Sequence, residues 1–227
     1  MTTVILLPGM DGTGTLYEPL RKALNGRCKL LVVTYPVDQV LDYAALEKVA
    51  RACLPADEEY ILLGESFSGP VAISIAASQP PGLRTLILCA SFARNPRSSL
   101  SGFRHLLSFV NVKMAPVVLI SHFLLGKFAT AEWCNLIRLA LATVSSDVLR
   151  ARMRNVLLAD VSSKLSYIKV PVLYFRATQD RLVPLSAYQE IEKTLPSTEL
   201  YEFDAPHFLL QVKAKEVADV IATYCVQ

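Results

Sequence analysis

The chain has 227 residues, of which 52% are hydrophobic and 19% charged, and its formal net charge is +3. This composition excludes an intrinsically disordered chain and fits one domain, or one domain with an insertion. Apolar runs such as residues 114–120 are far shorter than the roughly 20 residues that a membrane-spanning helix requires.

Expectations about compartment and metal content come from the first residues and the cysteines. Met1, Thr2 and Thr3 carry no basic side chain, and the apolar stretch 4–7 is too short for a secretory signal. The five cysteines are an odd number without Cys-x-x-Cys spacing, which is typical of reduced structural thiols. No group of cysteine, histidine and carboxylate residues has metal-ligand spacing. We therefore expect a cytoplasmic protein without a metal or another cofactor.

Short apolar strands alternate with helical patterns in the first 90 residues and again after residue 165. The expected strands are residues 4–7, 28–33, 60–64, 83–90, 170–175 and 199–203. The helices expected between and after them are residues 16–24, 41–54, 67–78, 186–195 and 208–224. Strands that are apolar throughout and alternate with helices indicate a parallel sheet covered on both faces. The fold class is therefore α/β, with a doubly wound, mostly parallel sheet of about six strands.

Residues 91–165 interrupt this alternation, because they contain no convincing strand. Their apolar spacing predicts helices at residues 102–110, 117–127, 132–142 and 148–158. The sheet then resumes, so the segment is an insertion between two strands of one sheet. We predict that residues 1–90 and 166–227 form the core and that residues 91–165 form a helical cap.

The predicted cap is basic, whereas the rest of the chain is acidic. Residues 91–165 hold ten lysines and arginines against three acidic residues, a net charge of +7, and the remainder carries −4. Such a segment can attract an acidic acyl carrier, coenzyme A or an anionic surface; the alternative is a set of solvated helix faces. A nucleic-acid partner is not expected, because the basic residues lack interleaved aromatic residues. The arginines concerned are Arg94, Arg97, Arg104, Arg150, Arg152 and Arg154.

Residues 60–73 place one serine at the turn between a strand and a helix. An apolar run ends at Gly64, and a pattern of small residues typical of a helix begins after Ser66. A serine at such a turn projects its hydroxyl above the sheet edge, and small residues two positions away on either side let strand and helix pass closely. Gly64 and Ser68 occupy these positions, in a Gly-x-Ser-x-Ser pattern. We predict that Ser66 is a nucleophile.

A serine hydroxyl needs a positioned base, which is itself oriented by a third group. Of the three histidines, His105 and His122 fall in the cap, where packing or surface positions are expected. His207 directly follows the last predicted strand, at the sheet edge where functional loops gather. We therefore predict that His207 is the base, the alternative being a helix-capping or surface histidine.

The acid is expected from the same sheet edge. Asp180 follows the strand at residues 170–175, which gives the chain order serine, aspartate, histidine expected for this kind of elbow. Asp204 lies only three residues from His207, which makes its approach to the ring awkward, and Asp160 ends a cap helix. We therefore predict Asp180 as the acid.

A tetrahedral intermediate also needs two donors aimed at its oxyanion. The backbone N–H of Phe67 follows the nucleophile, and the N–H of Met10 lies in the glycine-rich loop 8–14 after the first strand. This loop matches neither the dinucleotide-binding nor the Walker spacing, so a nucleotide site is not expected. We predict that Met10 and Phe67 form the oxyanion hole; the alternative for the loop is an ordinary tight turn.

The elbow at residues 64–69, the cap, Asp180 and His207 together resemble the α/β-hydrolase superfamily over essentially the whole chain. This resemblance implies a serine hydrolase that forms an acyl-enzyme and releases it to water or another acceptor. Residues 7–14 and 64–67 are also similar to the esterase, lipase and thioesterase-like part of plant phytyl-ester synthases. The chain differs in having Pro8-Gly9 where the superfamily often has His-Gly, and in lacking the first hairpin.

The expected reaction is hydrolysis of a carboxylic ester or thioester. Serine at position 66 argues against alkyl halide and epoxide substrates, for which relatives use aspartate. Substrate contacts are expected from Gly9, Asp11, Phe123 and Trp133. Other apolar cap residues shape the acyl pocket or pack the cap on the core. Two alternatives remain: acyl transfer to an acceptor other than water, and a ligand receptor that keeps the triad but has little turnover.

Overall fold

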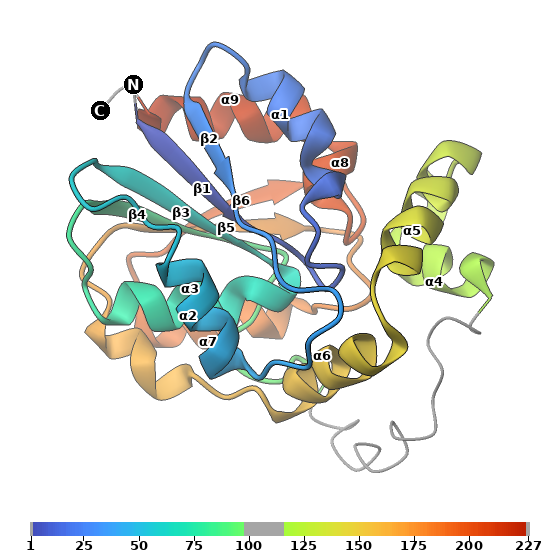
Figure 1. Ribbon diagram of the computed structural model, residues 1–227. Helices are drawn as coiled ribbons and strands as arrows, with labels where there is room; N and C mark the ends of the chain where they lie inside the picture. The colour runs from blue at the N-terminus through green and yellow to red at the C-terminus, as the bar shows by residue number, and fades with distance from the viewer. Residues whose placement is uncertain (1, 98–115, 226–227) are drawn as a thin grey trace.

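The computed structural model describes residues 2–97 and 116–225 (Figure 1). Its centre is a six-stranded, all-parallel sheet with the order β2-β1-β3-β4-β5-β6. The strands are β1 (Thr3–Leu7), β2 (Lys29–Val32), β3 (Tyr60–Glu65), β4 (Leu83–Cys89), β5 (Val172–Ala177) and β6 (Glu199–Phe203). The α/β class, the parallel sheet and all six predicted strands are therefore confirmed.

Helices cover both faces of the sheet, which explains why its strands are apolar throughout (Figure 1). One face carries α1 (Glu18–Leu24) and α9 (Ala214–Cys225); the other carries α2 (Tyr43–Arg51), α3 (Gly69–Ala77) and α7 (Leu185–Thr194). Successive residues of a strand point to opposite faces. Accordingly, Ile5 and Leu62 are buried in the core with α2 and α3, whereas Val4 and Ile61 are buried in the core with α1 and α9.

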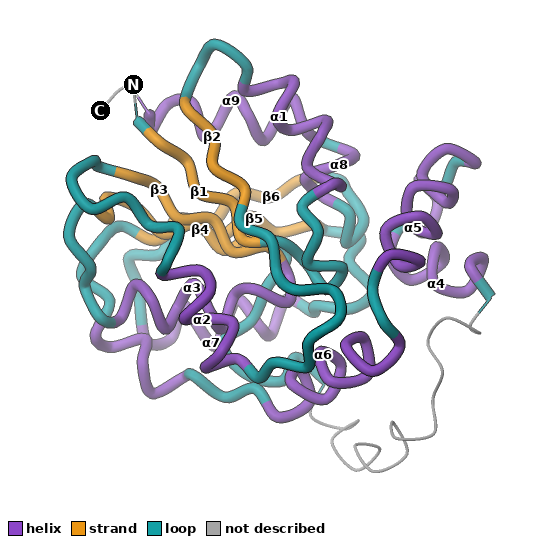
Figure 2. The backbone as a smooth tube through the Cα atoms, in the orientation of Figure 1, coloured by secondary structure: helices purple, strands orange, loops and turns teal. Residues whose placement is uncertain are grey.

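The segment between β4 and β5 is helical from Val117 to Tyr167, apart from short connections, as the sequence predicts for this part. Its described part contains α4 (Val117–Leu124), α5 (Ala131–Thr143), α6 (Ser146–Leu158) and the 3-10 helices η5 (Gly126–Phe128) and η6 (Ser162–Tyr167). Figure 2 shows α4 and α5 together beside the sheet, with α6 leading back toward the core. The predicted helix at residues 102–110 lies outside the described residues. Across residues 2–97 and 116–225, no helix is both long and apolar enough to cross a membrane.

Side chains that cap the helices fix where two helices of the insertion begin. Thr130 Oγ1 accepts a hydrogen bond from the Trp133 amide at 3.2 Å, directly before α5. Ser145 Oγ accepts one from the Val148 amide at 3.2 Å, directly before α6. Both residues satisfy amides of a first turn that lack a helical partner.

The last predicted helix, at residues 208–224, is wrong as a single element. The structure has a short helix α8 (Leu209–Val212), and α9 starts only after Lys213, whose φ of −115° and ψ of 31° are not helical. Leu209, Leu210 and Gln211 are all buried, whereas α9 buries only one face. A straight helix cannot bury three consecutive residues and then continue as an amphipathic helix along the sheet, so the chain bends at Lys213.

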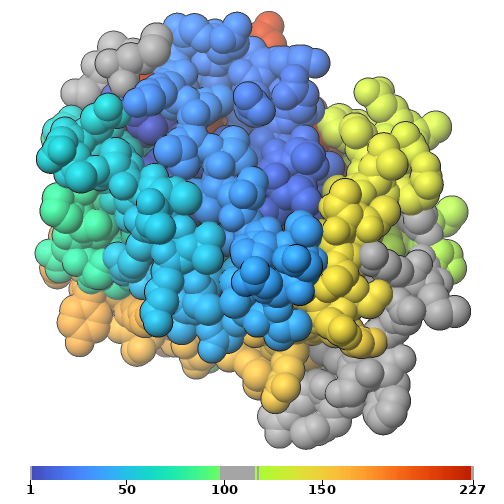
Figure 3. Space-filling view, viewed as in Figure 1, coloured from blue at the N-terminus to red at the C-terminus, as the bar shows by residue number. Residues whose placement is uncertain are grey.

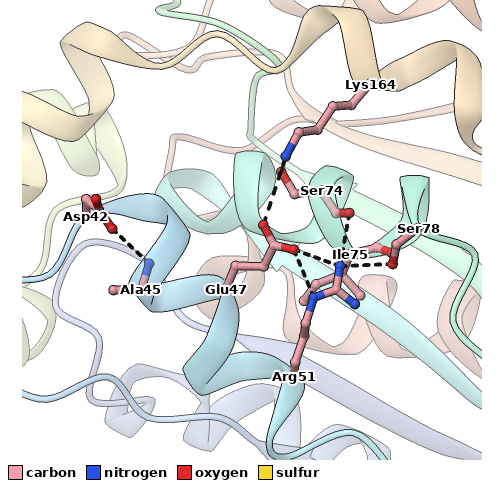
Figure 4. Close-up of polar contacts among 8 residues, drawn as sticks. All are labelled: Asp42, Ala45, Glu47, Arg51, Ser74, Ile75, Ser78 and Lys164. Atoms are coloured by element: carbon pink, nitrogen blue, oxygen red, sulfur yellow. Dashed lines mark hydrogen bonds and ion pairs between the residues drawn. The ribbon is translucent and has the colours of Figure 1, made fainter.

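A polar network joins α2, α3 and the end of the insertion (Figure 4). Arg51 contacts Glu47 at 2.7 Å and also donates to Ser78 Oγ at 2.9 Å. Lys164 of η6 donates to Ser74 Oγ at 2.8 Å and lies 4.0 Å from a Glu47 oxygen. The side chains of Glu47 and Arg51 are 21% and 33% exposed, so solvent screens their attraction only in part.

We expect the Glu47–Arg51 pair to contribute about 0.5–1 kcal/mol of coupling energy to folding, since its two nitrogen–oxygen contacts form between neighbouring helix turns. The measurement is urea unfolding of Glu47→Gln, Arg51→Met and the double variant. The same cycle on the exposed pair Arg84 and Glu59 is the control. A coupling no larger than that of the control would contradict the prediction.

Candidate active site

The loops after β1, β3, β5 and β6 meet at the carboxyl edge of the sheet. β1 and β3 are neighbours that pair from Thr3 with Tyr60 to Leu7 with Gly64. The chain winds from β1 to β2 on one side and from β3 to β6 on the other, so the strand order reverses between β1 and β3. Such a reversal opens a crevice above the strand ends, which is where ligands bind in open α/β sheets.

Ser66 lies at the sharp turn between β3 and α3 that the sequence predicts. Its φ of 46° is in the left-handed region, which is a strained conformation for a serine. Gly64 permits the turn, because a β-carbon there would lie 2.7 Å from Cβ of Ala72 and 3.0 Å from the Ser68 carbonyl oxygen. From the other side, Ser91 Oγ donates to the Ser66 carbonyl at 2.5 Å. The turn is therefore held by close packing and by a hydrogen bond.

Ser66, His207 and Asp180 form one hydrogen-bonded chain. Ser66 Oγ lies 2.8 Å from His207 Nε2, and His207 Nδ1 lies 2.7 Å from Asp180 Oδ2. A carboxylate only accepts hydrogen bonds, so Nδ1 carries the proton and Nε2 of the neutral ring is left to accept from the serine hydroxyl. The side chains of His207 and Asp180 are 7% and 3% exposed. The three residues predicted as a triad are thus brought together.

Backbone amides fix the orientation of the Asp180 carboxylate. Its Oδ1 accepts hydrogen bonds from the amides of Leu182 at 2.7 Å and Val183 at 2.9 Å, which leaves Oδ2 facing His207. The rival carboxylate, Asp204, is exposed and accepts instead from the side-chain amide of Gln179 at 2.6 Å. The geometry therefore agrees with the choice of Asp180.

The surroundings of His207 raise its pKa. Burial alone would lower the pKa of His207, but the charge and hydrogen bond of Asp180, together with the charge of Glu65, outweigh it and raise the pKa. A ring with this environment can take a proton from Ser66 and hold it as an imidazolium beside Asp180. That is the task of a general base.

Glu65, the residue before the nucleophile, also lines the site, which sequence reasoning missed. Its carboxyl is buried and accepts a hydrogen bond from Gln211 Nε2 at 3.1 Å. Burial and the nearby charge of Asp11 raise the pKa of Glu65, whereas the hydrogen bond from Gln211 opposes the rise. The sequence does contain a signal for this: Glu65 belongs to the elbow motif itself, where a side chain is expected to be buried.

The two predicted oxyanion donors belong to separate loops, after β3 and after β1. Phe67 is the middle residue of the 3-10 helix η2 (Ser66–Ser68), and its ring stacks on Tyr43 with centroids 5.0 Å apart, so only its backbone is available to the site. Met10 is the second residue of a turn closed by the Gly12 amide, which donates to the Gly9 carbonyl at 3.0 Å. The amide of a second turn residue is outside that hydrogen bond and can point elsewhere.

An apolar cavity of about 290 Å³ opens beside Ser66 and His207. The insertion supplies most of its apolar wall. The lining residues within the described part of the chain are Gly9, Met10, Asp11, Leu16, Glu65, Ser66, Ile120, Phe123, Leu124, Ile137, Ala140, Leu141, Leu149, Leu182, His207 and Phe208. A concave apolar pocket with a few polar groups is typical of a small-molecule site.

Three of the four predicted substrate contacts, Gly9, Asp11 and Phe123, line this cavity. Trp133 does not; it packs in the apolar cluster that contains Ile137 and Phe208, two residues of the cavity wall. Among the residues that the structure describes, no three histidine, cysteine or acidic side chains gather into a metal-binding group.

The arginines predicted to attract an anionic partner differ in their surroundings. Arg152 is buried, with 2% exposure, so the prediction that it attracts an anionic partner is wrong, and so is the alternative of a solvated face. Arg94 pairs with Glu190 at 2.6 Å, and Arg150 pairs with Asp147. Arg154 is exposed, and Arg104 lies outside the described residues. A partner for the remaining basic residues stays a prediction.

Two of the known proteins similar to this chain are named as a hydrolase and as an ester synthase. A protein named "Putative carbamate hydrolase RutD" from Caulobacter sp. (strain K31) is 25% identical over 224 residues, which covers 87% of this chain and 80% of that protein. Phytyl ester synthase 1, chloroplastic, from Arabidopsis thaliana is 33% identical over 107 residues, but these are 43% of this chain and only 15% of that protein.

Solved structures share the fold at low sequence identity. The hydrolase olei00960 from Oleispira antarctica superposes with a TM-score of 0.84 and 15% identity, covering 100% of this chain and 92% of that one. The esterase EaEST from Exiguobacterium antarcticum has a TM-score of 0.81 and 13% identity with the same coverage. Residues 34–205, most of the sheet and the insertion, match the family described as serine aminopeptidase, S33. This chain therefore belongs to the serine aminopeptidase S33 family of the α/β-hydrolase superfamily.

Proposed function

We propose that this protein is a serine hydrolase of carboxylic esters or thioesters, with Ser66 as nucleophile, His207 as base and Asp180 as the residue that orients His207. The observation that carries the proposal is the hydrogen-bonded chain of these three residues, with contacts of 2.8 and 2.7 Å, at the end of an apolar cavity. Relatives named as an esterase and as hydrolases support the class of reaction.

In the first half of the reaction, Ser66 Oγ attacks the carbonyl carbon while Nε2 of His207 takes the hydroxyl proton. The π electron pair of the carbonyl moves to its oxygen. The amides of Met10 and Phe67 stabilise the resulting oxyanion by donating hydrogen bonds to it. When the tetrahedral intermediate collapses, the bond to the alcohol or thiol breaks, and His207 returns its proton to that leaving group. Asp180 stabilises the imidazolium throughout.

In the second half, water takes the place of the departed group. His207 removes a proton from the water, whose oxygen attacks the acyl carbon and regenerates the oxyanion. Collapse of this intermediate releases the carboxylic acid, and Ser66 recovers its proton from His207. An alcohol that displaced water at this step would make the protein an acyltransferase.

The cavity favours short to medium acyl groups. Its volume of about 290 Å³ is at the lower end of the range for small-molecule sites. Its wall from α4 and α5 is apolar, with Ile120, Phe123 and Ile137 among the lining residues, so an alkyl or aryl acyl group fits it better than a charged one. The names of two relatives add carbamates and long-chain alcohol acceptors to the compounds worth testing.

The test is labelling of the purified protein with a fluorophosphonate, followed by peptide mapping of the modified residue. We expect one label per chain, on Ser66, and turnover of a p-nitrophenyl ester series with its optimum at short or medium acyl length. An ester series with added long-chain alcohol separates hydrolysis from acyl transfer. Label on another serine, or no label and no turnover, would contradict the proposal and leave a ligand receptor as the better reading.

Removal of the Glu65 charge is expected to move the acid limb of the pH profile. The charge of Glu65 raises the pKa of His207, so Glu65→Gln lowers that pKa. His207 must be neutral to act as base; activity is therefore lost as pH falls through its pKa, and a lower pKa moves this loss to lower pH. The measurement is kcat/KM against pH, with Glu192→Gln on α7 as the control. An acid limb that stays at the same pH, or moves to higher pH, would contradict the prediction.

A further inference from the structure

In the loop that carries Met10, every backbone carbonyl from Leu7 to Gly12 accepts a hydrogen bond. Gly9 is bonded within the loop, by the Gly12 amide at 3.0 Å, and Gly12 is bonded by the Tyr35 amide at 2.8 Å. The other four carbonyls accept from side chains outside the loop: Leu7 from Tyr17 Oη at 2.7 Å, Pro8 from Ser68 Oγ, and Met10 and Asp11 from Arg152 Nη1 at 2.9 and 2.8 Å.

Arg152 is the donor that comes from outside the core. It lies on α6 of the insertion, and its guanidinium also donates from Nη2 to the Pro36 carbonyl at 2.8 Å. It approaches the Tyr35 ring to 5.9 Å. Figure 3 shows the yellow surface of this part of the insertion against the blue surface of the N-terminal residues. One buried side chain thus joins the insertion to the loops after β1 and β2.

The loop is shaped around this guanidinium. Gly12 has a φ of +70°, and a β-carbon at this position would overlap the guanidinium, with Cζ of Arg152 only 2.8 Å away. The contact therefore requires both the arginine and the glycine. Burial of a guanidinium is costly unless its donors are satisfied, and here three of its five N–H groups donate to backbone carbonyls.

Ser68 holds the same loop from the elbow side. Its hydroxyl is fully buried, donates to the Pro8 carbonyl and lies 3.0 Å from the Tyr35 hydroxyl. This contact gives a physical role to the serine that stands in place of glycine in the elbow pattern. Ser68, Tyr35 and Arg152 each donate a hydrogen bond to the loop.

We propose that Arg152, assisted by Ser68, is a positioning residue that aims the Met10 amide at the oxyanion. A peptide unit is planar and trans, so a carbonyl held in one direction sends the amide of the same unit in the opposite direction. Gly12 holds the unit that contains the Met10 amide, and Arg152 holds the next two units. The insertion thereby sets the geometry of a donor that belongs to the core.

The inference rests on the proposed function and is tested on the full-length protein with Arg152→Met and Arg152→Lys. Arg154→Met, an exposed residue on the same helix, is the matched control. For a p-nitrophenyl ester we expect kcat to fall roughly 10- to 100-fold in both Arg152 variants, with KM little changed, because the oxyanion donor acts in the transition state. Lysine fails because one ammonium cannot reproduce the planar fork that spans three carbonyls.

Two further readouts separate positioning from stability. The affinity for an aryl boronic acid, whose adduct with Ser66 places an oxygen in the oxyanion site, is expected to fall in parallel with kcat. Hydrogen exchange of residues 8–14 is expected to accelerate in Arg152→Met at a temperature where the variant is folded. Ser68→Ala removes the hydrogen bond to the Pro8 carbonyl. We expect it to change kcat, boronic acid affinity and hydrogen exchange in the same directions, with a smaller loss of kcat.

An Arg152 variant with lower thermal stability but unchanged kcat and boronic acid affinity would overturn the inference while leaving the proposed function intact. If the wild type has no turnover that depends on Ser66, the proposed function fails instead. In that case the exchange of residues 8–14 still decides whether Arg152 holds the loop.

Discussion

Replacement of Ser66 by alanine is expected to lower kcat for ester hydrolysis by roughly 10⁴- to 10⁶-fold and to abolish fluorophosphonate labelling. The hydroxyl is the group that forms the acyl-enzyme, and no step of the mechanism proceeds without it. KM is expected to change little, because the apolar cavity binds the acyl group through other residues.

Folding is expected to survive this change. The Ser66 hydroxyl has His207 as its only side-chain partner among the described residues, and the packing around Gly64 does not involve it. Alanine keeps the strained φ of 46°, whereas Ser66→Gly relieves it, so the glycine variant should be at least as stable as the wild type. The measurement is kcat with labelling, alongside thermal unfolding, and the exposed Ser186→Ala is the control. Residual activity close to that of the wild type would identify another nucleophile.

The core of the fold could be predicted because its signal is local. Strands such as β1 and β3 are buried on both faces, so their sequences are apolar at consecutive positions and stand out from the helices. The elbow could also be predicted, because the close passage of strand and helix requires small residues around Ser66. Asp180 and His207 followed from the rule that parallel strands end at one edge.

The features that the sequence did not predict depend on contacts between distant segments, which the periodicity of apolar residues does not reveal. Arg152 looks like one more cation on a basic helix, yet it is buried because three carbonyls of two separate loops converge on it. Tyr174 lies within β5 and Ser91 follows β4, and neither stands out in the sequence, but Tyr174 Oη donates to the Ser91 carbonyl at 2.6 Å and Ser91 supports the elbow. The bend at Lys213 has no glycine or proline to signal it.

Replacement of Asp180 by asparagine is expected to lower kcat by roughly 10⁴-fold while the site keeps its shape. The amides of Leu182 and Val183 donate to Oδ1 of Asp180, so the single oxygen of asparagine must occupy that position. Its NH₂ group then faces His207 Nδ1 and donates to it. The proton of the neutral ring moves to Nε2, which can no longer accept the Ser66 proton.

The residual activity of Asp180→Asn provides a second, independent check through pH. The negative charge and hydrogen bond of Asp180 raise the pKa of His207, so their loss lowers it, and the acid limb of kcat/KM moves to lower pH. The kcat and the position of the acid limb are measured from about pH 5 to about pH 8, the range in which histidine titrates. Asp204→Asn, three residues before His207 and exposed, is the matched control and should keep wild-type kcat. A large loss in Asp204→Asn with little in Asp180→Asn would reverse the assignment, since the carboxylate that fixes the tautomer of His207 is the one whose loss removes the base.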